Sequence, residues 1–235
     1  MSFQNSRALA QTAAVAWLEE VEKSQRAGKP HCVALSGGRI AQDFFSVVVE
    51  MAGQRAASFR GVHFFWADER CVPPSDAQSN YRLASELLFE PLKIIESQIH
   101  RVPGELPPTI AATAAAEELR RLAPPDHHGQ PVLDLIFLGL GEDGHVASLF
   151  PGELATLSPT QPVYRAVANS PKPPPNRVTL DYPTIAAARK VWMLAAGAGK
   201  EMALRESLSP VGTTPFARVL HSRSDTRIFT DILVT

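Results

Sequence analysis

The chain has 235 residues, of which 45% are hydrophobic and 20% are charged, and its formal net charge at pH 7 is -1. These values are typical of a soluble globular protein with one large α/β domain or two small ones. They exclude nucleic acid as the expected main partner, because there is no basic excess, and a membrane span, because the sequence has no run of about 18 apolar residues.

Helices and strands alternate along the predicted order of elements. Apolar periodicity predicts a helix over residues 8–27, a strand over 31–35, a helix over 40–52, a strand over 62–66, a polar loop over 67–79, a helix over 80–88, a strand over 99–102, a helix over 108–122 and a strand over 132–138. The C-terminal part predicts strands over 163–167, 177–180 and 191–195, a helix over 200–208 and a last strand over 227–234. Such alternation predicts an α/β fold with a doubly wound, mostly parallel, Rossmann-like sheet and helices on both faces.

Residues 170–176 interrupt this alternation with four prolines. They are too rich in proline for a helix or a sheet strand, so we expect a stiff loop over the sheet edge. We interpret it as part of the fold and not as a domain boundary, and therefore expect a single domain over residues 1–235.

Residues 134–152 form the most informative segment. An apolar run, which predicts a buried strand, leads into Gly139, Gly141 and Gly144, and His145 follows at once. Open α/β folds bind ligands at the carboxyl edge of the sheet, where this turn belongs. Because an imidazole changes charge near neutral pH, His145 is a candidate acid or base.

Two other interpretations of this turn are possible. The glycine spacing matches the dinucleotide-binding fingerprint, but that motif needs a long helix and an acidic residue about 20 positions further on. Here Pro151-Gly152 ends any helix early, and the next predicted strand leads into Ala168-Asn169. The second interpretation is a plain tight turn with a solvated histidine. It is weakened because other parts of the chain carry residues suited to binding a phosphate.

Residues suited to binding a phosphate follow other predicted strands. Ser36-Gly37-Gly38-Arg39 offers backbone N–H groups at a helix N-terminus, and Lys200 begins a helix where a bound anion would relieve its conflict with the helix dipole. Asp68-Glu69-Arg70 and Arg177 stand at other strand ends. Together these residues predict a small phosphorylated substrate and acid–base chemistry. The alternative for residues 68–70 is a solvated loop with an internal Asp68–Arg70 pair, and Arg177 would ordinarily be a surface residue.

Metal, disulfide and secretion signals are weak. Cys32 and Cys71 are too few for a disulfide framework or a thiolate metal site, and His145 has no metal-type partners near it in the sequence. The N-terminal segment carries three glutamates among its apolar positions, unlike a secretion signal. We therefore expect no required metal and a cytoplasmic protein.

Taken together and in this order, these segments resemble the 6-phosphogluconolactonase family, within the larger fold group of glucosamine-6-phosphate isomerases. The matching segments are residues 35–38, 68–70, 79–81, 139–152, 173–180, and Gly197 with Lys200. The segment that ends in Phe150-Pro151-Gly152 is the most specific. Two positions depart from the family pattern: Arg39-Ile40-Ala41 replaces a Thr-Pro or Ser-Pro start, and Ala186 stands where asparagine is common.

The resemblance implies hydrolysis of 6-phospho-D-glucono-1,5-lactone to 6-phospho-D-gluconate in the oxidative pentose phosphate pathway, with no cofactor. It implies that His145 is the general base and then the acid, that Asp143 orients it, and that Arg177 and backbone N–H groups stabilise the oxyanion. The implied phosphate ligands are Ser36, Gly37, Gly38, Arg39, Arg70 and Lys200, and the implied substrate-binding loop residues are Asp68, Gly141 and Gly144.

Two alternatives to the lactonase remain at this point. A glucosamine-6-phosphate deaminase or isomerase shares the Asp-Gly-His turn, but such enzymes typically carry Asn-Glu before the Pro-Gly pair and Asp-Glu-Tyr in place of Asp68-Glu69-Arg70. A non-catalytic sugar-phosphate sensor is the other, although no DNA-binding segment is present and His145 is intact. The expected state is a monomer or a small homo-oligomer.

Overall fold

The structure is a computed structural model that describes residues 1–152 and 162–233. Its main sheet has five strands in the order β2-β1-β4-β7-β8, and every neighbouring pair is parallel. The strands are β1 (His31–Leu35), β2 (Val62–Trp66), β4 (Leu135–Gly139), β7 (Val191–Ala195) and β8 (Thr226–Thr230). Four of them are almost wholly apolar and buried, as parallel strands covered on both faces must be. The predicted parallel α/β fold is confirmed.

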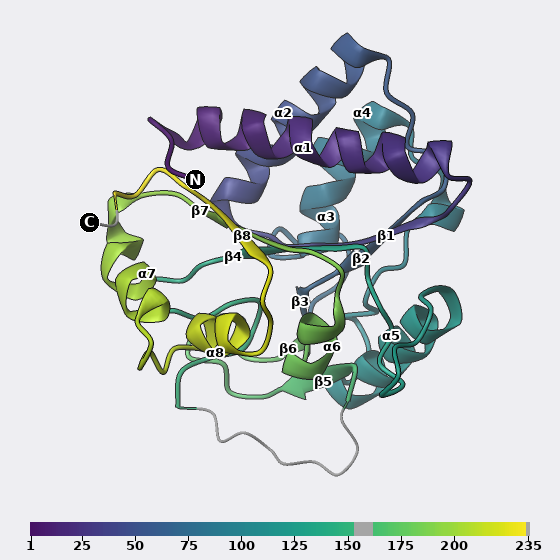
Figure 1. Cartoon of the computed structure of the whole chain (residues 1–235). Coiled ribbons are helices and arrows are strands. Elements are labelled where there is room, and N and C mark those ends of the chain that lie inside the picture. Colours follow the sequence, from purple (N-terminus) through teal and green to yellow (C-terminus); the bar gives the residue numbers. More distant parts are fainter. Residues whose placement is uncertain (153–161, 234–235) are drawn as a thin grey trace.

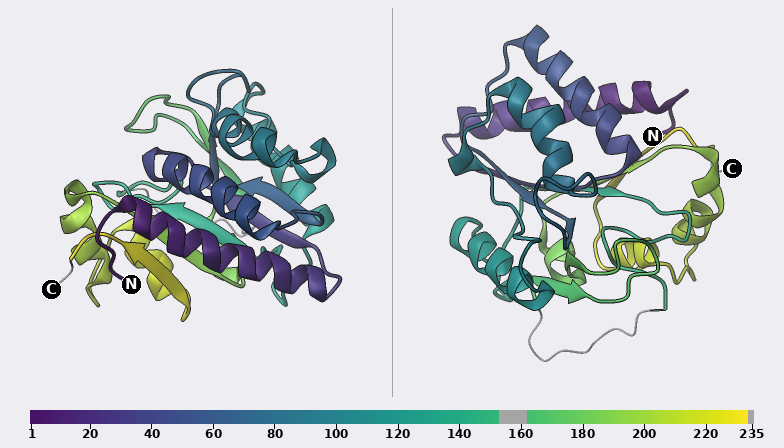
Figure 2. Two further views of the ribbon diagram at one scale, coloured as in Figure 1. Left: turned by 90° about the horizontal axis from the view of Figure 1, so that it is seen from above. Right: turned by 180° about the vertical axis from the view of Figure 1, so that it is seen from behind.

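Helices cover both faces of this sheet. The long helices α1 (Ser6–Arg26) and α2 (Arg39–Arg55) pack against each other on one side, while α6 (Tyr182–Ala187) and α8 (Pro215–His221) lie on the other (Figures 1 and 2). Next to α8 lies α7 (Glu201–Leu208). The sequence analysis missed α6 and α8, although α8 has a usual start, with Thr214 capping Ala217 N–H and Pro215 in the first turn.

A second, smaller sheet holds β3 (Asp68–Arg70), β6 (Arg177–Leu180) and β5 (Tyr164–Val167), in that order and all antiparallel. The helix α5 (Pro108–Leu122) packs against it. Residues 163–167 and 177–180 therefore lie outside the predicted, mostly parallel sheet and pair antiparallel with each other. The physical reason is the length of the proline-rich connection, which is too short for the crossover helix that parallel strands need.

Several predicted boundaries also change. The predicted helix over 80–88 is α3 (Asn80–Ala84), followed by a π-helix (Ser85–Phe89) and α4 (Glu90–Leu92). The predicted strand over 99–102 is wrong: Ile99 forms one isolated bridge with Phe64. Short 3-10 helices over Glu96–Gln98 and Ala198–Lys200 were not predicted, and β3 lies inside the predicted loop 67–79. The last predicted strand is shorter, and its final position, 234, lies outside the described residues.

The strand order creates a switch point between β1 and β4. The chain leaves β1 toward β2 on one side, whereas β4 pairs with β1 on the other side. Loops that leave the carboxyl ends of β1 and β4 therefore diverge and open a crevice, the usual ligand position in open α/β sheets. The Ser36 hydroxyl donates a hydrogen bond to Phe137 O at 2.8 Å and ties the β1 loop to β4 at this point.

Trp17 is the centre of the core between α1 and the main sheet. It is fully buried, with its ring centroid 5.9 Å from Phe44, 5.6 Å from Phe59 and 5.3 Å from Phe137. Its indole N–H donates to His31 Nε2 at 3.3 Å, so its one polar atom is satisfied. A buried aromatic residue with these neighbours contributes both apolar burial and ring–ring packing.

We expect Trp17→Ala to lower the free energy of unfolding by about 3–5 kcal/mol, because it leaves a large cavity. Trp17→Phe keeps most of the apolar contact and should cost less. Urea denaturation followed by far-UV circular dichroism measures both. Equal losses for the two variants would show that ring packing is not what holds α1 on the sheet.

Candidate active site

The carboxyl ends of β1, β2, β4 and β7 surround a pocket of about 150 Å³. Ten of the twelve site residues predicted from the sequence line this pocket, and the other two, Asp143 and Gly144, lie in the turn that carries His145. The ten are Ser36, Gly37, Gly38, Arg39, Asp68, Arg70, Gly141, His145, Arg177 and Lys200. The parallel sheet therefore brings together residues that are far apart in the sequence.

The turn after β4 fixes the position of His145. Gly141 N–H donates to His145 O at 2.9 Å, and Gly144 N–H donates to Gly141 O at 3.0 Å. A Cβ on Gly141 would overlap the His145 ring and the Asp143 carboxylate, so only glycine fits there. Gly144 has a φ of 79°, which also favours glycine. The glycines predicted as loop residues are thus required by close approach and by backbone conformation.

Asp143 orients the imidazole of His145. Its Oδ1 atom lies 2.5 Å from His145 Nδ1. An ionised carboxylate only accepts hydrogen bonds, so Nδ1 carries the proton and Nε2 has a free lone pair. His145 is mostly buried, and the Phe150 ring packs against it with the centroids 4.9 Å apart. Nε2 is therefore the atom available as a base.

The pKa of His145 lies below its usual value of 6.5, first because burial disfavours the charged ring. Lys172 also lowers this pKa, whereas Asp143 and Asp68 raise it. The net direction keeps the imidazole neutral at pH 7. This is the form that a general base needs.

A cationic, glycine-rich end of the pocket suits a phosphate group. Gly38, with a φ of 91°, precedes α2, and no side chain caps this helix N-terminus. The pKa of Lys200 is lowered first by burial and then by repulsion from the positive charge of Arg39. An anion bound between these cations and the helix N-terminus would relieve that repulsion.

Arg70 adds a third cation at the wall of this pocket. Its Nη1 donates to Gln78 O at 2.7 Å. Its Nε is buried and has no hydrogen-bond partner among the described residues. A buried guanidinium donor without a partner is costly, so a ligand oxygen is its natural acceptor.

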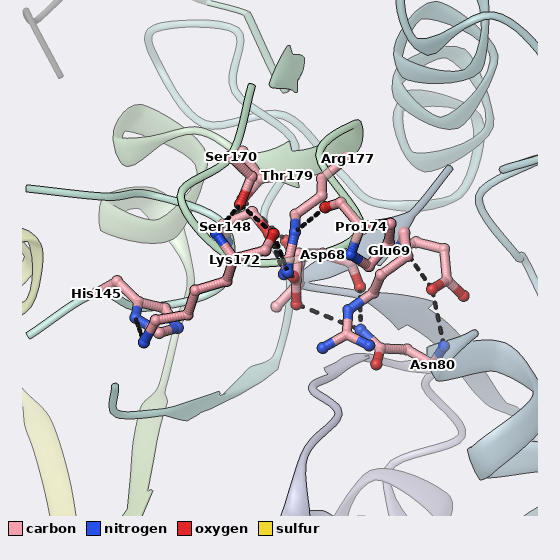
Figure 3. A network of polar contacts seen from close by, with 12 residues as sticks. Asp68, Glu69, Asn80, His145, Ser148, Ser170, Lys172, Pro174, Arg177 and Thr179 are labelled. Carbon is pink, nitrogen blue, oxygen red and sulfur yellow. Dashed lines mark hydrogen bonds and ion pairs between the residues drawn. The ribbon is translucent and has the colours of Figure 1, made fainter. Parts of the chain in front are cut away.

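Asp68 is held in a buried network and not in a solvated loop (Figure 3). The Ser148 hydroxyl donates to Asp68 Oδ2 at 2.6 Å, and Asn80 Nδ2 donates to Asp68 O at 2.9 Å. Arg177 Nη1 is 3.8 Å from the same Oδ2. The internal Asp68–Arg70 pair considered from the sequence is thus wrong, and the cation beside Asp68 is Arg177.

Glu69 anchors the wall behind this network. It is 2% exposed and accepts hydrogen bonds from the backbone N–H groups of Arg70, Asn80 and Tyr81 and from the Ser79 hydroxyl. Burial raises the pKa of Glu69, and the three backbone hydrogen bonds oppose that rise. The carboxylate thus ties β3 to the start of α3 and holds Asn80 against the site.

Arg177 is buried, contrary to the expectation of a surface residue. Its Nε donates to Pro174 O at 3.1 Å, its Nη2 donates to Lys172 O at 3.1 Å and to Pro173 O at 2.9 Å, and its Nη1 donates to Ser148 Oγ at 3.3 Å. These four hydrogen bonds leave one Nη1 N–H, and Asp68 Oδ2 lies 3.8 Å from that nitrogen. The predicted role as an oxyanion donor therefore rests on that single N–H.

Four further residues belong to this site and were not predicted from the sequence as site residues. Asn80, Ser148 and Glu69 complete the Asp68 network, and Lys172 Nζ lies 3.3 Å from His145 Nδ1. The serine and the asparagine stand inside motifs that were recognised, so their positions carried a signal. Lys172 lies in the proline-rich loop, and no local sequence pattern there indicates contact with His145.

The two departures from the family pattern lie in different places. Arg39 and Ile40 line the pocket, so the first departure faces the ligand. Ala186 lies in a separate hollow beside His127 and Arg218. Only the first departure is therefore in a position to contact a bound substrate.

Residues 1–152 and 162–233 contain neither a candidate metal site nor a candidate membrane span. Within these residues, no group of three or more His, Cys, Asp and Glu side chains gathers in a way that could hold a metal ion. No helix in the same part of the chain has the length and hydropathy needed to cross a membrane.

Comparison with known proteins now identifies the family. Residues 4–228 match the family model described as glucosamine-6-phosphate isomerases/6-phosphogluconolactonase. The chain belongs to this family. It is 33% identical over 210 residues to the 6-phosphogluconolactonase of Streptomyces coelicolor, covering 87% of this chain and 80% of that protein.

Solved structures of this family have the same fold. The 6-phosphogluconolactonase of Trypanosoma brucei superposes with a TM-score of 0.84 at 28% identity and covers 98% of this chain and 94% of that one. A monomeric glucosamine-6-phosphate deaminase superposes with a TM-score of 0.81 over 98% of this chain and 95% of that one, at 17% identity. At that identity the likeness shows the fold alone. The two activities of the family must therefore be separated by the site.

Gly141→Ala should lower kcat by about 100-fold or more, because the new methyl group displaces the base from its working position. Gly53→Ala is the matched control, since a Cβ at Gly53 meets open space and the residue lies away from the pocket in α2. Steady-state kinetics and thermal unfolding of both variants give the comparison. Normal kcat in a folded Gly141→Ala protein would contradict the close approach described here.

Proposed function

We propose that this protein is a 6-phosphogluconolactonase, which hydrolyses 6-phospho-D-glucono-1,5-lactone to 6-phospho-D-gluconate in the oxidative pentose phosphate pathway. The observation that carries the proposal is the pairing, in one pocket, of an oriented neutral histidine with a cationic glycine turn. The likeness to relatives named 6-phosphogluconolactonase at 33% and 35% identity supports it.

The 6-phosphate binds at the glycine end of the pocket. Backbone N–H groups of Gly37, Gly38 and the first turn of α2 face the phosphate oxygens, and Arg39 and Lys200 balance its charge. Arg70 supplies a further donor from the wall. This anchor lies far from the bond that breaks, so its binding energy positions the lactone carbonyl beside His145.

His145 performs the proton transfers. Its Nε2 takes one proton from a water molecule, whose oxygen bonds to the lactone carbon C1. The C1–O5 ring bond then breaks, and Nε2 returns the proton to O5, after which the new carboxylic acid ionises. The one Arg177 N–H that the loop and Ser148 do not use is the donor to the oxyanion. Each step uses groups of the chain, and none needs a cofactor.

The position of Asp68 argues against the deaminase alternative. An isomerisation moves a proton between adjacent sugar carbons and requires a free carboxylate base near C2. Asp68 Oδ2 instead accepts a hydrogen bond from Ser148 and faces Arg177. The oxygen that faces these groups is therefore not free to take a proton from a sugar carbon. The cytoplasmic location and the monomeric or small homo-oligomeric state remain predictions from the sequence.

We expect His145→Ala to lower kcat for 6-phosphogluconolactone by about 10²–10⁴-fold while the fold is kept. The measurement is proton release after mixing with freshly prepared lactone, corrected for spontaneous hydrolysis. A folded variant that keeps more than about a tenth of the wild-type kcat would refute His145 as the base.

Ammonia release from glucosamine 6-phosphate that disappears in Asp68→Asn would establish the deaminase instead.

Arg70→Ala and Lys200→Ala should each weaken binding of the phosphorylated lactone by about 1.5–3 kcal/mol, because each removes a charge-assisted hydrogen bond. The KM for 6-phosphogluconolactone should rise. The matched control is unphosphorylated glucono-1,5-lactone, whose slower hydrolysis should hardly change. If KM rises equally for both lactones, these two residues support the fold and do not bind phosphate.

A further inference from the structure

We propose that Lys172 is a positioning residue for His145: Arg177 holds the proline-rich loop so that the Lys172 ammonium group lies against the imidazole and keeps it uncharged. The inference rests on the proposed function, in which neutral His145 is the base. It gives a role to the proline-rich loop, residues 170–176, which takes no part in phosphate binding or in the attack of water.

The Lys172 ammonium group, a hydrogen-bond donor, lies beside the His145 Nδ1–H group, which is also a donor (Figure 3). Its Nζ is 3.3 Å from His145 Nδ1 and 3.4 Å from Asp143 Oδ1. An ammonium group only donates hydrogen bonds, and His145 Nδ1 already donates to Asp143. Lys172 therefore donates to the carboxylate and places its positive charge next to the ring edge. A second positive charge on the imidazole is disfavoured by this neighbour.

The loop that carries Lys172 is held at three successive carbonyl groups. Arg177 binds the carbonyl oxygens of Lys172, Pro173 and Pro174 through its Nε and Nη2 atoms. The Ser170 hydroxyl donates to Lys172 O at 2.9 Å and fixes the loop from the other side. The Arg177 guanidinium is in turn held by Ser148 and Asp68. Asp68 is thus linked to His145 through Arg177 and the backbone of the loop.

The charges that face His145 come from three segments. Asp143 lies in its own turn, Asp68 follows β2, and Lys172 comes from the proline-rich loop. Both carboxylates favour the imidazolium ion, whereas burial and Lys172 oppose it, and the pKa of His145 is lowered overall. Among the contributions from the described residues, burial alone would then oppose the two carboxylates if Lys172 were removed. The imidazole would then hold its proton at higher pH and lose its use as a base near neutrality.

The same placement assists the second proton transfer. An imidazolium ion beside Lys172 is a stronger acid than one beside Asp143 alone, so it returns its proton to the ring oxygen more readily. Lys172 thus acts on both halves of the reaction without contacting the reacting atoms. It is a positioning residue and not a catalytic one.

The test is an NMR titration of the His145 ring proton in the wild type, Lys172→Met and Lys172→Arg, with His145→Gln to assign the signal. We expect the titration midpoint to move to higher pH in Lys172→Met and to return toward the wild-type value in Lys172→Arg. The ratio of kcat/KM at pH 6 to that at pH 8 should fall by about threefold or more in Lys172→Met. Lys29→Met is the control and should change neither quantity. Lys29 is exposed and precedes β1, at the end of that strand away from the pocket.

An unchanged or lower midpoint in Lys172→Met would overturn the proposal. Lys172→Gln keeps a polar side chain and gives the same test if the methionine variant does not fold. The titration needs no substrate, so it separates this inference from the lactonase proposal. An active His145→Ala enzyme would refute the role of His145 as the base. An unchanged His145 midpoint in Lys172→Met would refute the role of Lys172.

Arg177→Lys tests the link through the loop, because lysine keeps the charge but does not reach three carbonyl groups with a planar fork. It should raise the His145 midpoint in the same direction as Lys172→Met, and the double variant should shift it little further. Two fully additive shifts would show that Arg177 does not act through Lys172.

Discussion

A buried ion pair between Asp68 and Arg177, which lie on neighbouring strands of the smaller sheet, supports the active site of this protein. Both side chains are less than a tenth exposed. Two charges removed from water are costly unless hydrogen bonds replace their hydration. Ser148 and Asn80 donate to the Asp68 carboxylate, and three loop carbonyls accept from Arg177. The segment after β2, the turn after β4 and the start of β6 are therefore fixed relative to one another. The pair thus sets the place of the proline-rich loop and, with it, of Lys172.

The parallel sheet supplies the second constraint. Because its strands point the same way, their carboxyl ends deliver a glycine turn, a histidine turn and Lys200 to one edge. The phosphate end binds by charge and by backbone N–H groups, while the histidine end is kept neutral by burial and by a neighbouring cation. One pocket thus combines a charged anchor with an uncharged base. This combination suits a phosphorylated lactone, whose reactive carbon is remote from its phosphate.

Sequence patterns predicted those parts of the molecule that depend on local order. The parallel strands, the glycine turns and the placement of His145, Arg39 and Lys200 follow from short apolar runs that end in glycine. The β5–β6 hairpin was missed because strand pairing is a tertiary property, although the short proline-rich connection could have indicated it. The partner of Asp68 was also missed, because Arg70 is nearer in sequence whereas Arg177 is nearer in space. The contact between Lys172 and His145 depends on that same pairing, so no local pattern could have predicted it.

The most direct test of the central claim is a crystal structure with the product, 6-phospho-D-gluconate. The phosphate should lie at the N-terminus of α2 between Arg39 and Lys200, and a carboxylate oxygen should lie within about 3.2 Å of His145 Nε2, the reach of a general base. A phosphate bound beside His145, or a product that leaves the glycine turn empty, would contradict the account.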